Sequence, residues 1–119
     1  MDRQQIGRDA EQRASDFLGA AGLSIVTRNY RCRMGELDIV ASNGNTLVIA
    51  EVRCRSSANF GGAAASVTPR KQQRIVRASR HLLARHPALA RYPVRFDVLV
   101  VPANGADIEW LRGAFDASC

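Results

Sequence analysis

The sequence predicts an α/β or α+β protein in which helices cover a mixed β-sheet. Two observations lead to this expectation. Three strand-like segments separate two amphipathic helical segments, and two further strand-like segments follow the second helix. A chain of 119 residues is long enough for one hydrophobic core, so we expect one domain over residues 1–119.

The first helix is expected at residues 7–21, because small and apolar side chains recur there at steps of three and four residues. This stripe consists of Ala10, Ala14, Phe17, Leu18 and Ala21. Gly22 is a suitable residue to end the helix. Residues 23–30 then predict a short strand that leads into a basic segment at residues 28–33.

Residues 36–55, ELDIVASNGNTLVIAEVRCR, predict a β-hairpin around Asn43-Gly44, because both central positions of a type I′ turn need a positive φ. A two-residue loop would place Glu36 opposite Glu51, whereas a four-residue loop would place Asp38 opposite Glu51. Side chains alternate between the faces of a strand. Either register therefore gathers Asp38 and Glu51 on one face, roughly 5–8 Å apart, and that face also carries Glu36 and Arg53.

The second half of the chain opens with small residues and glycines at 56–67, which predict a mobile loop. Thr68 and Pro69 then favour the start of a helix, as N-cap and first helical residue. Its apolar stripe is Ile75, Val76, Ser79, Leu82 and Leu83, and its other faces are basic. Residues 94–101 predict a long strand in which Asp97 pairs with Arg95, and residues 108–111 predict a short last strand.

The charge of the chain favours a polyanionic partner. Seventeen basic and eleven acidic residues give a net charge of +6 and a pI near 10.2, which indicates nucleic acid as the leading partner class. Sixteen of the basic residues are arginines and one is a lysine, Lys71, a skew typical of a genome-wide codon bias. The chain lacks both an apolar run of about 18 residues and the hydrophobic region of a signal peptide, so we expect it in the cytoplasm and not in a membrane.

Carboxylates gathered on one sheet face repel one another, so a positive charge must compensate them. Two compensations are open. Arg53 and nearby arginines could form ion pairs with the acids, or a divalent cation could bind Asp38 and Glu51. Mg²⁺ favours a site of one or two carboxylates completed by water and phosphate oxygens. A metal held there beside a basic helix would polarise a phosphodiester and activate water.

The spacing of Asp38 and Glu51-Val52-Arg53 resembles the motif of the PD-(D/E)xK nuclease superfamily. Further segments resemble the YraN-like family of uncharacterised bacterial proteins, which is predicted to be endonuclease-like and is similar to archaeal Holliday junction resolvases. These segments are GRDAE, NYRCRMGELDIV, VIAEVRCRSS, FGGAAASVTPRKQQRI and RFDVLVV. The resemblance runs from residue 7 to about residue 115. It implies a restriction-endonuclease-like three-layer fold with a central mixed β-sheet flanked by helices.

The resemblance also implies roles for particular residues. Asp38 and Glu51 would hold Mg²⁺ or Mn²⁺, with Glu11 as a third acid nearby and Glu36 as a supporting residue. Asp38, Glu51, Arg53, Glu11 and Gln72 are the expected catalytic set. The expected nucleic-acid contacts are Arg70, Lys71, Arg74, Arg77, Arg33 and Arg55. A homodimer is a further expectation, since resolvase-like substrates suggest two-fold symmetry.

The chain departs from the superfamily motif at Arg53, which stands where a lysine is expected. Arginine keeps its proton in proteins and cannot act as a base, although its planar fork can hold a phosphate oxygen. Two functions from different classes therefore stay open. The first is a metal-dependent DNA endonuclease with branched or distorted DNA as its substrate. The second is a non-catalytic nucleic-acid-binding module of nuclease ancestry.

Overall fold

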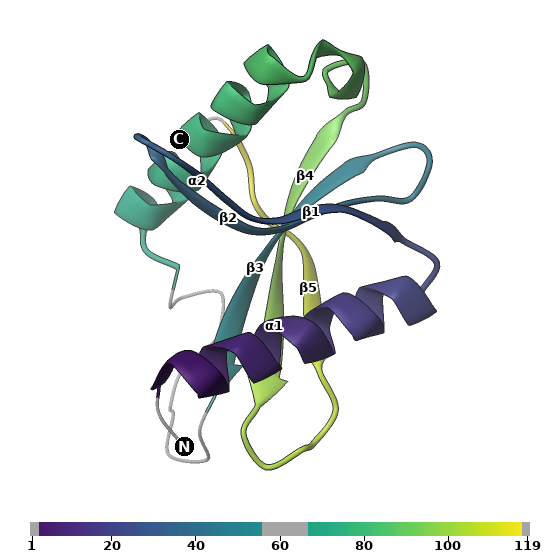
Figure 1. The fold of residues 1–119 in the computed structure, drawn as a ribbon, viewed down its shortest axis with the longest axis vertical. Helices are drawn as coiled ribbons and strands as arrows, with labels where there is room; N and C mark the ends of the chain where they lie inside the picture. Colours follow the sequence, from purple (N-terminus) through teal and green to yellow (C-terminus); the bar gives the residue numbers. More distant parts are fainter. Residues whose placement is uncertain (1–2, 56–66, 118–119) are drawn as a thin grey trace.

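The computed structural model describes residues 3–55 and 67–117 (Figure 1). Along the chain its elements are α1 (Arg3–Ala20), β1 (Ser24–Cys32), β2 (Gly35–Ser42), β3 (Leu47–Arg55), α2 (Pro69–Arg85), the short 3₁₀-helix η2 (Pro87–Leu89), β4 (Val94–Pro102) and β5 (Glu109–Phe115). Most of the loop predicted at residues 56–67 lies outside the described residues. Neither described α-helix is long and apolar enough to cross a membrane.

The five strands form one mixed sheet in the order β1-β2-β3-β4-β5. Neighbouring strands are antiparallel except β3 and β4, which run parallel and are connected through α2. A parallel pair needs such a crossover, because the chain must return to the same end of the sheet. The predicted α/β class and mixed sheet with helices are confirmed, and the arrangement is consistent with a three-layer restriction-endonuclease-like fold.

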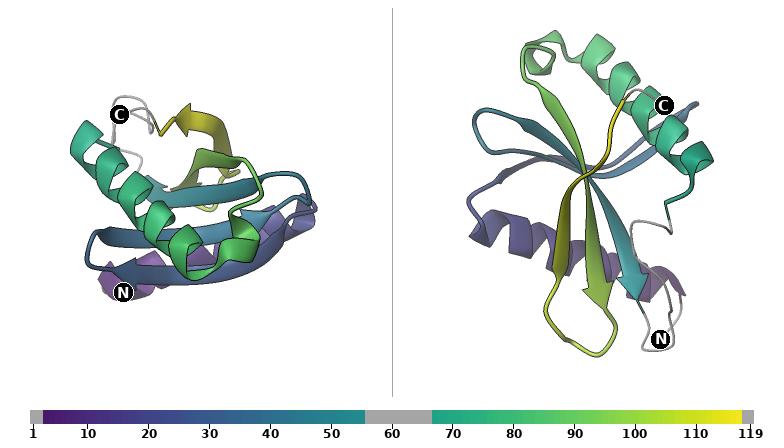
Figure 2. Two further views of the ribbon diagram at one scale, coloured as in Figure 1. Left: turned by 90° about the horizontal axis from the view of Figure 1, so that it is seen from above. Right: turned by 180° about the vertical axis from the view of Figure 1, so that it is seen from behind.

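The sheet buries apolar side chains on both faces, as expected for strands covered by a helix on each side. The core on the α2 side includes Val40, Leu47, Ile49, Ile75, Leu82 and Val98. The core on the α1 side includes Ala14, Leu18, Ile39, Ala41, Val48 and Leu99. Figure 2 shows α1 and α2 well apart, with strands between them. The alternation of apolar residues along each strand therefore builds two separate cores.

Two registers were predicted for the β2–β3 hairpin, and it adopts the one with a four-residue loop. Ser42 is paired with Leu47, and the backbone amides of Asn45 and Thr46 donate to Oδ1 of Asn43 at 2.9 and 2.8 Å. These bonds give two loop amides a side-chain acceptor, as in an Asx-turn. The register of the hairpin is therefore set by the Asn43 side chain as well as by Gly44, whose φ is 94°.

The sheet forks beyond this hairpin. Pairing between β2 and β3 ends at Ile39 and Ala50. Past that point β2 stays paired with β1 as far as Gly35, whereas β3 stays paired with β4 as far as Arg55. The two branches separate in Figure 1. We call this point the fork, and Asp38 and Glu51 are the first residues beyond it.

Helix α2 begins where the sequence predicts. The backbone amide of Lys71 donates to Oγ1 of Thr68 at 3.2 Å, and Pro69 is the first helical residue. The helix packs closely on the β1–β2 branch of the fork: a Cβ atom at Gly35 would lie 3.1 Å from the backbone oxygen of Arg74. A side chain at Gly35 would push the start of α2 away from the sheet.

Other element boundaries differ from the prediction. Helix α1 begins at Arg3 rather than at residue 7, since Gln5 Nε2 donates to Asp9 Oδ1 at 3.0 Å and supports a first turn that has no apolar stripe. Strand β5 extends to Phe115, well beyond the predicted residue 111. Phe115 stacks on Phe96 of β4, a contact between strands that local sequence does not reveal.

Asp97 is the charged residue at the centre of β4 and is fully buried. Its carboxylate accepts two hydrogen bonds from Arg95, each 2.9 Å long, one from Nε1 of Trp110 at 2.8 Å and one from the backbone amide of Gly113 at 2.9 Å. The predicted pairing with Arg95 is confirmed. Asp97 therefore joins β4 to the edge strand β5.

Replacing Asp97 with alanine should lower the free energy of unfolding by about 3–5 kcal/mol, because the hydrogen-bond donors of Arg95, Trp110 and Gly113 lose their acceptor. Urea unfolding followed by circular dichroism measures the change. Asp107→Ala removes an exposed carboxylate and should change the free energy of unfolding by less than about 0.5 kcal/mol. Equal effects of the two substitutions would contradict a structural role for Asp97.

Candidate functional site

The two central carboxylates of the site stand side by side because the sheet forks. Extending the β2–β3 register by one residue sets Asp38 opposite Glu51. Since β2 has left the ladder there, the backbone amide of Val52 donates to Oδ2 of Asp38 at 2.9 Å. The Asp38 side chain thus replaces the main-chain acceptor that β3 loses at the fork.

The environment of the pair favours a shared proton. The Glu51 side chain is 5% exposed, and that of Asp38 is largely buried. Burial, together with a hydrogen bond to Glu51 and the charge of Glu51, raises the pKa of Asp38 to about 8. The Val52 amide and the charge of Lys71 act in the opposite direction. At neutral pH the pair therefore keeps a proton in the absence of a cation.

Lys71 of α2 provides a positive charge next to Glu51. Its Nζ lies 3.1 Å from Oε2 of Glu51. Oε2 nevertheless has no hydrogen-bond partner with acceptable geometry, although it is buried. The ammonium thus offsets the charge without satisfying the oxygen. A buried carboxylate oxygen left in this state is costly, and it can accept a further ligand.

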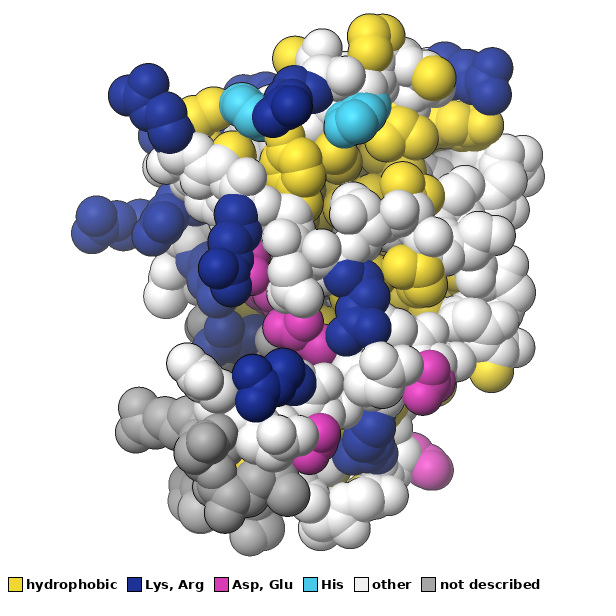
Figure 3. Space-filling view, in the orientation of Figure 1, with side chains coloured by type: hydrophobic (Ala, Val, Ile, Leu, Met, Phe, Trp, Pro, Cys, Tyr) yellow, Lys and Arg dark blue, Asp and Glu magenta, His cyan; other side chains and the backbone are white. Residues whose placement is uncertain are grey.

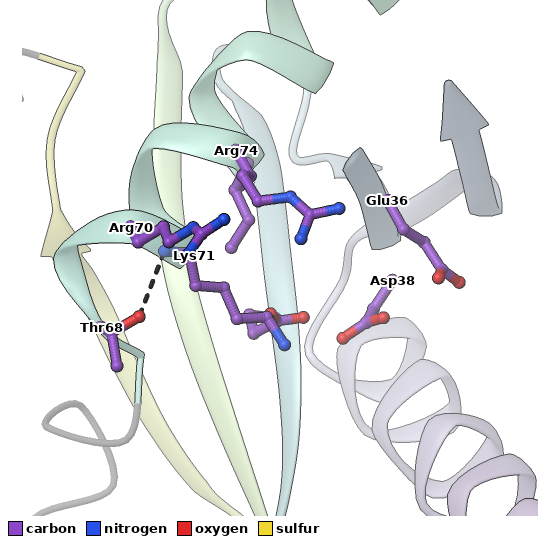
Figure 4. A pocket seen from close by; sticks show the side chains of 8 residues that line it. Glu36, Asp38, Thr68, Arg70, Lys71 and Arg74 are labelled. Atoms are coloured by element: carbon purple, nitrogen blue, oxygen red, sulfur yellow. Dashed lines mark hydrogen bonds and ion pairs between the residues drawn. The ribbon is translucent and has the colours of Figure 1, made fainter. Parts of the chain in front are cut away.

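These acids lie at one side of a pocket of about 350 Å³, and the start of α2 forms the other side. Its lining residues are Glu36, Asp38, Glu51, Thr68, Arg70, Lys71, Arg74 and Ile75. Figure 4 shows the side chains of Lys71 and Arg74 extending from α2 toward the carboxylates of the strands. The pocket therefore combines buried acids with a basic rim.

A second, strongly basic cavity of about 400 Å³ adjoins this pocket. It is lined by Arg33, Met34, Arg70, Gln73, Arg74 and Arg77. Arg70 and Arg74 line both cavities, so the basic surface is continuous. In Figure 3 the acidic side chains near the middle of the face lie among Lys and Arg side chains. An extended anion could follow this surface away from the acids.

Glu11 and Glu36 lie near the pair in different settings. Partial burial and the charge of Asp38 raise the pKa of Glu11, while a hydrogen bond with Asn29 and the charge of Arg28 act in the opposite direction. Glu11 therefore approaches Asp38 from α1. Glu36 is more exposed and forms an ion pair with Arg31, with 3.4 Å between Oε1 and Nε.

Three other residues predicted for the site lie outside the pocket lining. Arg53 is half-buried on β3, two residues after Glu51, and is not among the described residues that line the pocket. Gln72 donates from Nε2 to the backbone oxygen of Val67 at 2.9 Å. Arg55 is exposed at the end of β3.

The residues present fit a divalent metal ion. Mg²⁺ and Mn²⁺ prefer oxygen ligands, and the site offers a carboxylate pair with one buried oxygen that lacks a hydrogen bond. Within residues 3–55 and 67–117 there is no group of three His, Cys, Asp or Glu side chains arranged to hold a metal ion. A cation on Asp38 and Glu51 would therefore need water or phosphate oxygens to complete its shell.

Sequence reasoning missed the ion pair between Lys71 and Glu51. It offered arginines as the compensating cations and assigned Lys71 to a phosphate contact. The available signal was that Lys71 is the single lysine of an arginine-rich chain. Its distance from Glu51 follows from the packing of α2, which strand and helix periodicity do not specify.

Comparison with known proteins relates the chain to bacterial proteins of similar length. The model of the Uncharacterised protein family UPF0102 matches residues 10–101. A UPF0102 protein of Legionella pneumophila is 43% identical over 116 residues, which cover 98% of each chain. A UPF0102 protein of Nitrosomonas europaea is 49% identical over 113 residues, 94% of each chain. A UPF0102 protein of Alcanivorax borkumensis is 45% identical over 116 residues, 95% of this chain and 93% of its own.

The raised pKa of Asp38 predicts how the stability of the metal-free protein depends on pH. Between about pH 4 and pH 8 the folded protein holds a proton that the unfolded chain releases, so the free energy of unfolding falls as pH rises. Asp38→Asn removes this contribution. Relative to the wild type, the variant should gain about 4 kcal/mol between pH 5 and pH 9.

Urea unfolding in EDTA at several pH values measures this difference. Glu36→Gln, a change in a more exposed acid of the same strand, serves as the control. Its stability curve should stay parallel to that of the wild type. A curve for Asp38→Asn that is also parallel to the wild type would contradict the proton-sharing pair.

Proposed function

The chain belongs to the uncharacterised protein family UPF0102, and we propose that it is a metal-dependent endonuclease that binds DNA and hydrolyses a phosphodiester bond. One observation carries the proposal. Buried Glu51, with an oxygen that has no hydrogen bond, lies beside Asp38 in a pocket whose other side carries Arg70, Lys71 and Arg74. Acids that can hold a cation thus face basic residues that can hold a phosphate.

The chemistry divides between the two sides of the pocket. Mg²⁺ or Mn²⁺, when bound, would supply a Lewis acid for the phosphoryl oxygen and lower the pKa of a bound water. Asp38 and Glu51 hold the position for the ion. Arg70 and Arg74 bind the phosphate oxygens through charge-assisted hydrogen bonds. Water attacks phosphorus, the bond to the leaving oxygen breaks, and a phosphate monoester and an alcohol are formed.

The basic surface favours a polynucleotide as the substrate rather than a small phosphate ester. A second cavity continues from the acidic pocket and gives room for phosphates next to the one that is cut. Its lining includes Arg33, Arg70, Arg74 and Arg77. These residues are suited to backbone contacts, which position a nucleic acid without reading its sequence. Branched or distorted DNA is the proposed substrate, as the resemblance to resolvases suggests, and a homodimer is the proposed assembly.

A specific observation favours a second candidate function. The residue two positions after Glu51 is an arginine, which cannot accept a proton, and it does not line the pocket. A protein of nuclease ancestry that binds DNA through the same basic surface without cutting it would have this arrangement. The two candidates share the nucleic-acid surface and differ in whether the carboxylate pair is used.

Cleavage of synthetic four-way junction, flap and duplex DNA with Mg²⁺ or Mn²⁺ separates the two candidates. Asp38→Ala and Glu51→Gln should each lower the cleavage rate at least about 100-fold, because each removes a ligand of the proposed ion. Glu109→Ala, an exposed acid on β5, should leave the rate within about twofold. DNA binding without any cleavage by the wild type would support the non-catalytic module.

The basic surface predicts salt-dependent DNA binding. Replacing Arg74 and Arg77 together with glutamine should weaken binding and reduce the slope of log K against log salt concentration by about 1–2, since about two phosphate contacts are lost. Fluorescence anisotropy at several salt concentrations measures the slope. Arg91 lies over Tyr92, away from this surface, so Arg91→Gln removes one positive charge elsewhere and should leave the slope almost unchanged. A slope equally insensitive to both changes would argue against this surface.

A further inference from the structure

Lys71 stands between the acidic and the basic parts of the pocket. Its side chain is 44% exposed, whereas that of its partner Glu51 is 5% exposed. It belongs to the first turn of α2, which the Thr68 cap holds in place. In Figure 4 the Lys71 side chain extends from this turn toward the strands, and its Nζ lies 3.1 Å from Oε2 of the buried Glu51. One flexible side chain thus connects a buried carboxylate with the solvent-accessible pocket.

The contact between Lys71 and Glu51 is an ion pair at the edge of the solvent-accessible pocket. Nζ is 3.1 Å from Oε2, yet that oxygen lacks a hydrogen bond. An ammonium has three donors and a flexible four-carbon stem, so it can turn to another acceptor without moving the helix. A metal ion bound to the Glu51 carboxylate would also repel the ammonium, because both carry positive charge.

We propose that Lys71 is the resident counter-cation of Glu51 in the metal-free protein, and that a divalent metal displaces it and frees it to contact the phosphate of DNA. This inference rests on the proposed function and deepens it. Without DNA, Lys71 and the metal compete for Glu51, so Lys71 weakens metal binding. With DNA, the released ammonium strengthens binding of the phosphate, so metal and DNA favour each other through Lys71.

Lysine suits this exchange better than arginine. A lysine ammonium is a compact point charge, while a guanidinium binds through a planar fork that prefers two acceptor oxygens held in one plane. Arg70 and Arg74 line the same pocket, where they can hold phosphate oxygens directly. The single lysine of the chain therefore lies against the buried acid, at a position where a compact cation fits.

Mn²⁺ titrations of the full chain by calorimetry, without DNA, test the competition. Lys71→Met keeps the length of the side chain and removes its charge, so Mn²⁺ should bind about tenfold more tightly than to the wild type. Lys71→Arg keeps the charge and should stay within about threefold of the wild type, which separates the loss of charge from damage to the fold. Arg80→Met, an exposed charge on α2, is the matched control and should change the affinity by less than twofold.

DNA affinity in EDTA and in Mn²⁺ tests the release of the ammonium. In EDTA, Lys71→Met and Arg80→Met should lose the same small factor, because Lys71 is held by Glu51. In Mn²⁺, Lys71→Met should bind DNA about tenfold more weakly than Arg80→Met. Anisotropy of a labelled oligonucleotide, recorded before cleavage proceeds, measures both conditions.

The outcomes distinguish this inference from the proposed function. Absence of Mn²⁺ binding by every variant would overturn the proposed metal-dependent function, and the inference with it. Mn²⁺ binding of equal strength by the wild type and Lys71→Met would overturn the inference alone. Equal DNA affinities of Lys71→Met and Arg80→Met in Mn²⁺ would also overturn the inference alone.

Discussion

The fork between β2 and β3 is the constraint on which the site depends. Up to Ile39 and Ala50 the two strands share a ladder, and beyond that point each stays paired with its other neighbour. The separation leaves the Val52 amide without a main-chain partner from β2, and the Asp38 carboxylate takes that place. Two acids are thereby held together at the opening, where regular pairing would have continued the sheet.

Helix α2 completes the opening with positive charge. Its close approach to β2 at Gly35 places the first turns of the helix over the acids. Lys71 then meets Glu51, while Arg70 and Arg74 line the rest of the pocket. The arrangement is costly to the metal-free protein, since Asp38 keeps a proton and one oxygen of Glu51 lacks a hydrogen bond. Strain of this electrostatic kind in a basic pocket is typical of functional sites.

Much of the fold and part of the site could be predicted from the chain. The cap at Thr68, the turn at Gly44 and the two acids of the hairpin were correctly placed, because each depends on residues close in sequence. The early start of α1 and the length of β5 were not, because they depend on side-chain bonds and on packing against β4. The ion pair of Lys71 with Glu51 was not anticipated, since Lys71 follows Glu51 by twenty residues.

The sequence by itself determined the alternation that places Asp38 and Glu51 on one face, the basic character of α2 and the membership of a bacterial protein family. These features are local or compositional, so short-range stereochemistry and charge specify them. Only the tertiary structure decided where the sheet forks and which cation lies against Glu51. The reason is that the packing of α2 on β2 sets distances between residues far apart in the chain, and no local pattern encodes that packing.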